Sequence, residues 1–147
     1  MFYNVEQMKP FSILLLAMIC LSSCKSKPTN QIVNKKREGI WIEKYAIDSA
    51  QYQSIGNYKH DDPTKKWKYY LNGEIIKKER YHKKYCQTKT FHQNGMIQAK
   101  GKTRLDQNGK EMHWYYSGNW KYYDDQGKLI TIRQYNNGEL ISEKKTK

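Results

Sequence analysis

The sequence predicts an all-β fold: an elongated antiparallel meander of stacked β-hairpins that follows a signal peptide and a flexible tether. Turn-forming dipeptides recur along the chain, four of them Asn-Gly, at 72–73, 94–95, 108–109 and 137–138, and a fifth, Gln-Gly, at 126–127. Asn-Gly favours the positive φ angles of the type I′ turn, whose twist matches that of a hairpin. The runs between these turns are rich in Tyr, Ile, Thr and Trp, which favour strands. After the leader no apolar stripe has a period of 3.6 residues, so we expect no long helix.

These runs predict four pairs of strands. The expected pairs are 39–45 with 51–58, 65–71 with 74–81, 85–91 with 96–103, and 118–124 with 128–135. A single hairpin cannot bury its apolar face, whereas a series of hairpins side by side can share one row of aromatic side chains. Abundant Lys protects the open edges of such a sheet.

The first 23 residues have the character of a signal peptide. Residues 11–21 form an uncharged apolar run of eleven, which is too short to span a bilayer but suits the h-region of a leader. The four residues Leu21-Ser22-Ser23-Cys24 resemble the lipobox of bacterial lipoproteins, in which the Cys becomes the lipidated N-terminus. We therefore expect Cys24 to carry the lipid. The alternatives are a buried N-terminal helix, or a plain signal peptide with an accidental Cys.

The sequence thus divides into three parts: a leader at 1–23, a lipidated Cys with a basic tether at 24–37, and a β-repeat domain at 38–147. The tether lacks hydrophobic periodicity and contains Pro28, which favours a flexible spacer. The protein is expected to be exported and anchored by its lipid. The outer membrane of a Gram-negative bacterium, on the periplasmic side or the cell surface, is the location that this implies.

The composition predicts a core built mainly from aromatic rings. The chain is poor in aliphatic side chains but has 13 Tyr and 4 Trp, and each large ring buries about 150–250 Å². Side chains alternate between the faces of a strand, so Trp67 and Tyr69 share one face and Lys68 and Tyr70 the other. The same alternation sorts four residues near the C-terminus: Trp120 and Tyr122 on the first face, Lys121 and Tyr123 on the second.

Two segments repeat one another. Trp67-Lys68-Tyr69-Tyr70 is followed by Gly73 and Ile75, and Trp120-Lys121-Tyr122-Tyr123 by Gly127 and Leu129. Gly-x-Trp precedes the second copy at Gly118, while Lys65 replaces this Gly in the first. The pattern resembles the bacterial variant of the MORN repeat over about residues 39–142. The resemblance implies stacked MORN-like hairpins. Eukaryotic MORN proteins are linked to membranes and protein scaffolding, and we expect a non-catalytic binding or scaffolding role at the cell envelope. Some members of the repeat family are labelled as the antitoxin component of a toxin–antitoxin pair.

The sequence offers no catalytic, metal or cofactor site. The four His (60, 82, 92 and 113) form no zinc motif, and the carboxylate pairs Asp61-Asp62 and Asp124-Asp125 are accounted for by turns. Cys86 cannot form an intramolecular disulfide once the leader is removed, and it is expected to be a small buried hydrophobe. An envelope hydrolase remains only a third alternative.

The feature that points to a function is the excess of basic residues, which gives a formal charge of +13 and is interleaved with aromatic residues. In a cytoplasmic protein this would suggest nucleic acid, which the leader argues against. The expected partners are instead anionic lipid, lipopolysaccharide or an acidic glycan, and the candidate binding residues are Lys68, Tyr70, Lys121 and Tyr123. The simplest alternative is that these lysines only keep the sheet soluble. The second functional class is an antitoxin-like or immunity protein that masks a toxin by protein–protein contact.

Overall fold

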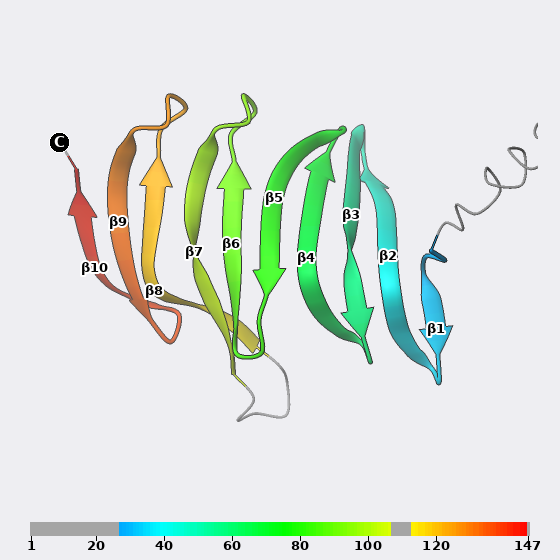
Figure 1. Cartoon of the computed structure of the whole chain (residues 1–147). Helices are drawn as coiled ribbons and strands as arrows, with labels where there is room; N and C mark the ends of the chain where they lie inside the picture. The colour runs from blue at the N-terminus through cyan, green and yellow to red at the C-terminus, as the bar shows by residue number, and fades with distance from the viewer. Residues whose placement is uncertain (1–26, 107–112, 147) are drawn as a thin grey trace, which may run out of the picture.

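The chain folds as one open antiparallel sheet of ten strands in sequence order (Figure 1). This computed structural model describes residues 27–106 and 113–146. The strands are β1 (Gln31–Val33), β2 (Lys36–Ile47), β3 (Ala50–Lys59), β4 (Asp62–Leu71), β5 (Glu74–Tyr81), β6 (Tyr85–Phe91), β7 (Ile97–Asp106), β8 (His113–Tyr123), β9 (Leu129–Asn136) and β10 (Glu139–Lys145). The predicted all-β meander is confirmed, and within these two ranges there is no helix, hence none that could cross a membrane.

The sheet differs from the expected one mainly at its start. Strand β1 and the first residues of β2 lie inside 24–37, the segment predicted to be a flexible tether. The reason is a tight turn at Asn34-Lys35, both with positive φ, which pairs Val33 with Lys36. Residues 1–26, with the leader and Cys24, and the Asn108-Gly109 pair lie outside the described residues.

Four of the five predicted turn pairs adopt one of two hairpin geometries according to the length of the loop. In Asn72-Gly73 and Asn137-Gly138 both residues have positive φ, as a two-residue type I′ loop requires. In the longer loop around Gly95 only the Gly has positive φ, and its N–H donates to the carbonyl of His92. The Gly127 loop has the same arrangement, with Asp124 in the place of His92. All of these turns lie between consecutive strands, so each chain reversal is local.

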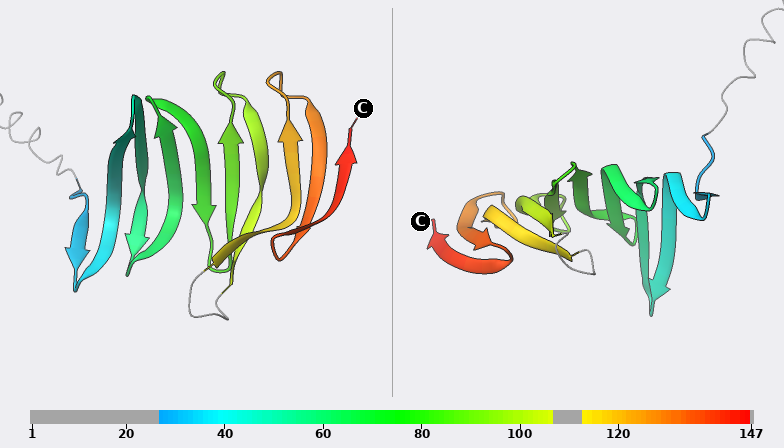
Figure 2. Two further views of the ribbon diagram at one scale, coloured as in Figure 1. Left: turned by 180° about the vertical axis from the view of Figure 1, so that it is seen from behind. Right: turned by 90° about the horizontal axis from the view of Figure 1, so that it is seen from below.

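The sheet is a single layer that twists along its length (Figure 2). No second layer of described residues covers it, so burial comes from side chains that lie flat on one face. Trp67 and Trp120 are 3% and 2% exposed and form the centres of two clusters, which confirms the predicted aromatic core. Each ring packs directly on a glycine of the neighbouring strand, Gly56 or Gly101. We call the side that carries these rings the aromatic face.

A bulge places each of these tryptophans over its glycine. Between β3 and β4 the register steps from Ile55–Lys68 to Asn57–Thr64, and between β7 and β8 from Lys100–Lys121 to Lys102–Ser117. The inserted residues include one of positive φ two positions before the tryptophan: Lys65 in β4 and Gly118 in β8. Each indole N–H then donates to the carbonyl next to the glycine, that of Asn57 at 3.2 Å or Lys102 at 3.0 Å.

Candidate functional site

The face opposite the tryptophans carries five lysines in a single line across five strands. The pairing registers join Lys68 of β4 to Lys78, Lys78 to Lys89, Lys89 to Lys100, and Lys100 to Lys121 of β8. We call these five residues the lysine row. Directly paired residues of adjacent strands point to the same face, so the five side chains project from the same side of the sheet.

The lysine row has a defined length and defined ends. Neighbouring strands are about 4.8 Å apart, so the four steps from Lys68 to Lys121 extend over about 19 Å. The line continues into apolar residues on both sides, Ile55 on β3 and Ile132 on β9. The charged stretch is therefore a bounded segment in the middle of the sheet.

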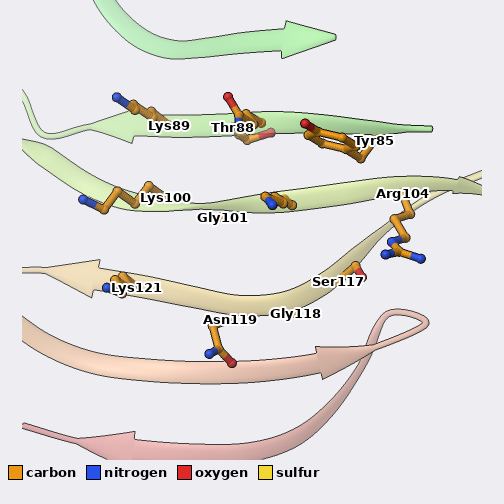
Figure 3. Close-up of a pocket in the computed structure, with 12 residues that line it drawn as sticks. Tyr85, Thr88, Lys89, Lys100, Gly101, Arg104, Ser117, Gly118, Asn119 and Lys121 are labelled. Atoms are coloured by element: carbon orange, nitrogen blue, oxygen red, sulfur yellow. The ribbon is translucent and has the colours of Figure 1, made fainter. Parts of the chain in front are cut away.

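Two shallow grooves follow the row. The larger, of about 660 Å³, lies over β6, β7 and β8, and the other, of about 460 Å³, lies over β4, β5 and β6. They share Gln87 and Lys89, so they form one continuous depression. Further cations line it beside the lysine row: Lys66, Arg80, Lys102 and Arg104. Figure 3 shows Lys89, Lys100 and Lys121 on three successive strands, with their side chains reaching toward the same end of the sheet.

Aromatic rings on the same face hold three of the ammonium groups. Lys78 lies 4.9 Å from the centroid of the Phe91 ring, and Lys100 lies 5.1 Å from that of Tyr123. Lys102 lies 5.1 Å from the ring of Tyr85. Cation–π contacts of this kind fix the side chains at a cost in rotamer freedom before any ligand arrives. They leave most of each ammonium group's hydrogen-bonding capacity unused.

No carboxylate neutralises the lysine row among the described side chains. Glu79 of β5 is the one acidic residue beside the grooves, and its carboxylate is on the aromatic face. There it accepts hydrogen bonds from Tyr69 at 2.6 Å and Tyr81 at 2.9 Å and pairs with Lys77 at 3.1 Å. Burial, and then the adjacent Glu79 charge, raise the pKa of Tyr69 and of Tyr81 above the ordinary tyrosine value. Both phenols therefore remain neutral donors to that carboxylate.

Cys86 is the one cysteine among the described residues. Cys86 is 1% exposed on the aromatic face, and burial followed by the Glu79 charge raises the pKa of its thiol to about 11. A reactive cysteine requires the opposite, a lowered pKa and an accessible sulfur. In the described ranges, His, Cys, Asp and Glu form no cluster of three or more suited to a metal ion.

The structure brings the predicted binding residues to one face. Lys68 and Lys121 are the two ends of the lysine row, and Tyr70 and Tyr123 lie beside them on the same strands. The prediction missed the three central members, Lys78, Lys89 and Lys100. Alternation alone assigns each of them to a face, but only the pairing registers of β4 to β8 align them. Those registers contain shifts at Tyr69/Tyr70, Thr90/Phe91 and Lys100/Lys102.

Comparison with known proteins gives no match for this chain, whether to a family model, to a curated protein or to a solved structure.

Proposed function

We propose that this chain is a non-catalytic binding or scaffolding protein of the bacterial cell envelope that holds an anionic partner on its lysine row. The observation that carries the proposal is the register of Lys68, Lys78, Lys89, Lys100 and Lys121. Five cations at neighbouring positions, with no carboxylate among them, generate a strong local positive potential. A groove with that potential attracts anions.

The pairing register of the lysine row argues that these lysines do more than keep the sheet soluble. Like charges directly opposite each other on adjacent strands destabilise a sheet. Lysines that only protect a sheet surface lose nothing by alternating with Thr, Gln or Glu, yet here four consecutive pairs are all Lys–Lys. An anionic partner removes this repulsion, so the arrangement favours the bound state over the free one.

The leader supports a location outside the cytoplasm. A lipid on Cys24 would hold the sheet close to a membrane, with residues 25–30 between the lipid and strand β1. Two or more acyl chains are needed for stable anchoring, and a lipidated N-terminal Cys supplies them. Labelled palmitate is expected to enter the wild-type protein and not the Cys24→Ala variant; label on that variant would contradict the anchor.

The recurring tryptophan unit supports the interpretation of the domain as MORN-like repeats. The same bulge and the same glycine contact occur at Trp67 and Trp120, although one unit has Lys65 where the other has Gly118. Repeats of this kind present long regular surfaces, which suits a binding or scaffolding role.

Binding of the full chain to phosphatidylglycerol vesicles and to lipopolysaccharide tests the proposal. We expect binding that weakens as salt rises and that a Lys68→Gln/Lys121→Gln variant reduces. The matched control is Lys59→Gln/Lys128→Gln, which removes the same charge from two exposed lysines outside the grooves. No binding of any polyanion by the wild type, or equal losses in both variants, would remove the proposal.

A second function, an antitoxin-like protein that masks a partner, is favoured by the C-terminal edge. Strand β10 has a neighbour on one side only, and Leu140 and Ile141 are 52% and 56% exposed. An open edge with apolar side chains is suited to pairing with another protein. Crosslinking of the lipidated protein in the envelope distinguishes the two functions, because the antitoxin-like function requires a protein captured at β10. The Leu140→Lys variant would abolish that capture.

A further inference from the structure

The lysine row fits a long, narrow ligand rather than a compact one. Its members lie on five different strands, so the line of charge runs across the sheet, perpendicular to the strands. A single phosphate or carboxylate would meet only two or three of these lysines. A ligand that uses all five must itself be a chain with regularly repeated negative charge.

We propose that the lysine row binds one chain of an acidic polysaccharide, whose repeated carboxylates pair with lysines along the row. This rests on the proposed binding function of the same face and names its ligand. The lysines recur at the strand spacing of about 4.8 Å, so a chain with closely repeated negative charge can meet several of them at once. A polyuronate has one carboxylate on each sugar and offers such a repeated charge.

The other groups along the groove suit a ligand rich in hydroxyl groups. Gln87, Ser117 and Asn119 line the larger groove between the cations, and each offers both a donor and an acceptor. Figure 3 shows Ser117 and Asn119 on the same strand as Lys121, with Ser117 near Arg104. A polyhydroxylated chain finds hydrogen-bond partners here that a simple inorganic anion would leave unused.

A bilayer surface fits this face less well. Membrane-surface binding combines basic charge with apolar side chains that enter the headgroup layer. Among the described residues, the exposed large apolar side chains are Ile32, Val33, Tyr45, Ile47, Met96, Tyr116, Ile130, Leu140 and Ile141. None of them lies in β4, β5, β6 or β7, and Tyr116 of β8 is on the aromatic face, stacked on Trp120 at 4.1 Å. Among these described residues, the lysine row thus has an exposed apolar neighbour only near its Lys121 end, where Ile130 lies on β9, and none along its length.

Single-stranded nucleic acid also fits less well. Proteins that bind it stack the bases on open aromatic rings. Along this groove the rings of Phe91, Tyr123 and Tyr85 are within cation–π distance of Lys78, Lys100 and Lys102. Their faces are therefore partly covered before a ligand binds.

The test measures affinity of the full chain for galacturonate as monomer, trimer and pentamer. We expect the affinity to rise steeply from the monomer to the pentamer, and a methyl-esterified pentamer, which lacks the charge, not to bind. The Lys89→Gln/Lys100→Gln variant interrupts the row at its centre and is expected to lower the affinity for the pentamer by about tenfold. Lys59→Gln/Lys128→Gln is the control and should bind as the wild type does, with equal circular dichroism confirming that both variants fold.

The remaining outcomes show whether only the glycan proposal fails or the proposal of an anion-binding face fails with it. Binding to phosphatidylglycerol vesicles but not to the pentamer, lost in the Lys89/Lys100 variant, would overturn the glycan and retain an anion-binding face. Preference for a single-stranded oligonucleotide over the pentamer would likewise overturn the glycan and retain an anion-binding face. Pentamer binding that is unaffected in the Lys89/Lys100 variant would place the glycan elsewhere and overturn the site. Absence of all anion binding would overturn both proposals.

Discussion

The two tryptophan units use different residues to make the same contact. In both, a bulge in one strand brings an indole ring onto a glycine of its neighbour, Gly56 under Trp67 and Gly101 under Trp120. The residue that takes the left-handed conformation is Gly118 in the C-terminal unit but Lys65, at φ 59°, in the N-terminal one. The aromatic neighbours of the two tryptophans also differ: Tyr58 and Tyr69 pack on Trp67, and Tyr116 packs on Trp120. The comparison shows that the fold depends on the glycine–indole contact and tolerates a strained residue at the bulge.

The largest expected effect on stability comes from removing either tryptophan ring. Trp67→Ala and Trp120→Ala should each lower the free energy of unfolding by about 3–5 kcal/mol, because each removes a buried ring and leaves a void. Trp67 has two aromatic neighbours, Tyr58 at 4.9 Å and Tyr69 at 6.2 Å between ring centroids, whereas Trp120 stacks on Tyr116 at 4.1 Å. Urea unfolding measures both. A loss below about 1 kcal/mol would mean that the two faces of the sheet are assigned the wrong way round.

A smaller loss is expected when the glycine under each ring gains a methyl group. A Cβ at Gly56 would lie 1.9 Å from a ring carbon of Trp67, and one at Gly101 would lie 2.2 Å from a ring carbon of Trp120. Both rings must shift, so Gly56→Ala and Gly101→Ala should each cost about 2–3 kcal/mol by overpacking. Tryptophan fluorescence together with urea unfolding measures the shift and its cost. The control is Gly73→Ala, where a Cβ meets no atom within 4 Å and only the positive φ is strained.

The bulge residues predict effects of opposite sign. Lys65→Gly should raise the free energy of unfolding by about 1 kcal/mol, because a left-handed conformation is unfavourable for a residue with a Cβ. Gly118→Ala should lower it by a similar amount for the same reason. Thermal unfolding is sufficient to measure both changes.

The matched control for the bulge pair is Lys66→Gly. Lys66 is next to Lys65 but does not have a positive φ, and it pairs with Arg80 of β5, so glycine there should destabilise the sheet by about 0.5–1 kcal/mol. Stabilisation by both lysine-to-glycine changes would contradict the explanation from φ, since charge removal alone would then account for it.

The last expected effect appears only at alkaline pH and concerns the region between the two units, where Cys86 lies. Its folded pKa is about 11, above the value of an exposed thiol, so the folded state keeps its proton where the unfolded state loses it. The stability that this contributes is complete below about pH 8.5 and is lost as the pH rises through 11. The urea midpoint should therefore fall over this range by less in Cys86→Ala than in the wild type. An identical fall in both would assign the alkaline loss to the tyrosines alone.

Much of the fold follows from local chemistry. The turn dipeptides at 72–73 and 137–138 reverse the chain because Asn and Gly accept positive φ, and the residues between the turns favour strands. The turns at Asn34-Lys35 and His60-Asp61 have the same geometry without a glycine, so the sequence gives little sign of them. Strand β1 was missed for this reason, and β4 starts three residues earlier than expected, at Asp62.

The candidate site was predictable only in part. Alternation along one strand assigned Lys68, Tyr70, Lys121 and Tyr123 to a common face, because a strand has a period of two residues. The alignment of Lys78, Lys89 and Lys100 with Lys68 and Lys121 required the register of four strand pairs. A shift of one residue in any pair would move a lysine to the other face.

The sequence by itself determined that this protein is a β-meander with an aromatic core and a basic opposite face, because turn preference, strand propensity and alternation are properties of short segments. It also marked Cys24 as the expected lipid site. Only the tertiary structure decided which lysines line up and where the row ends. That outcome depends on how consecutive strands pair, including two bulges in which the tryptophan ring of one strand packs on a glycine of its neighbour. The bulge at Trp120 lies in the β7–β8 pair of the row, and the bulge at Trp67 lies in the β3–β4 pair at the end of the row.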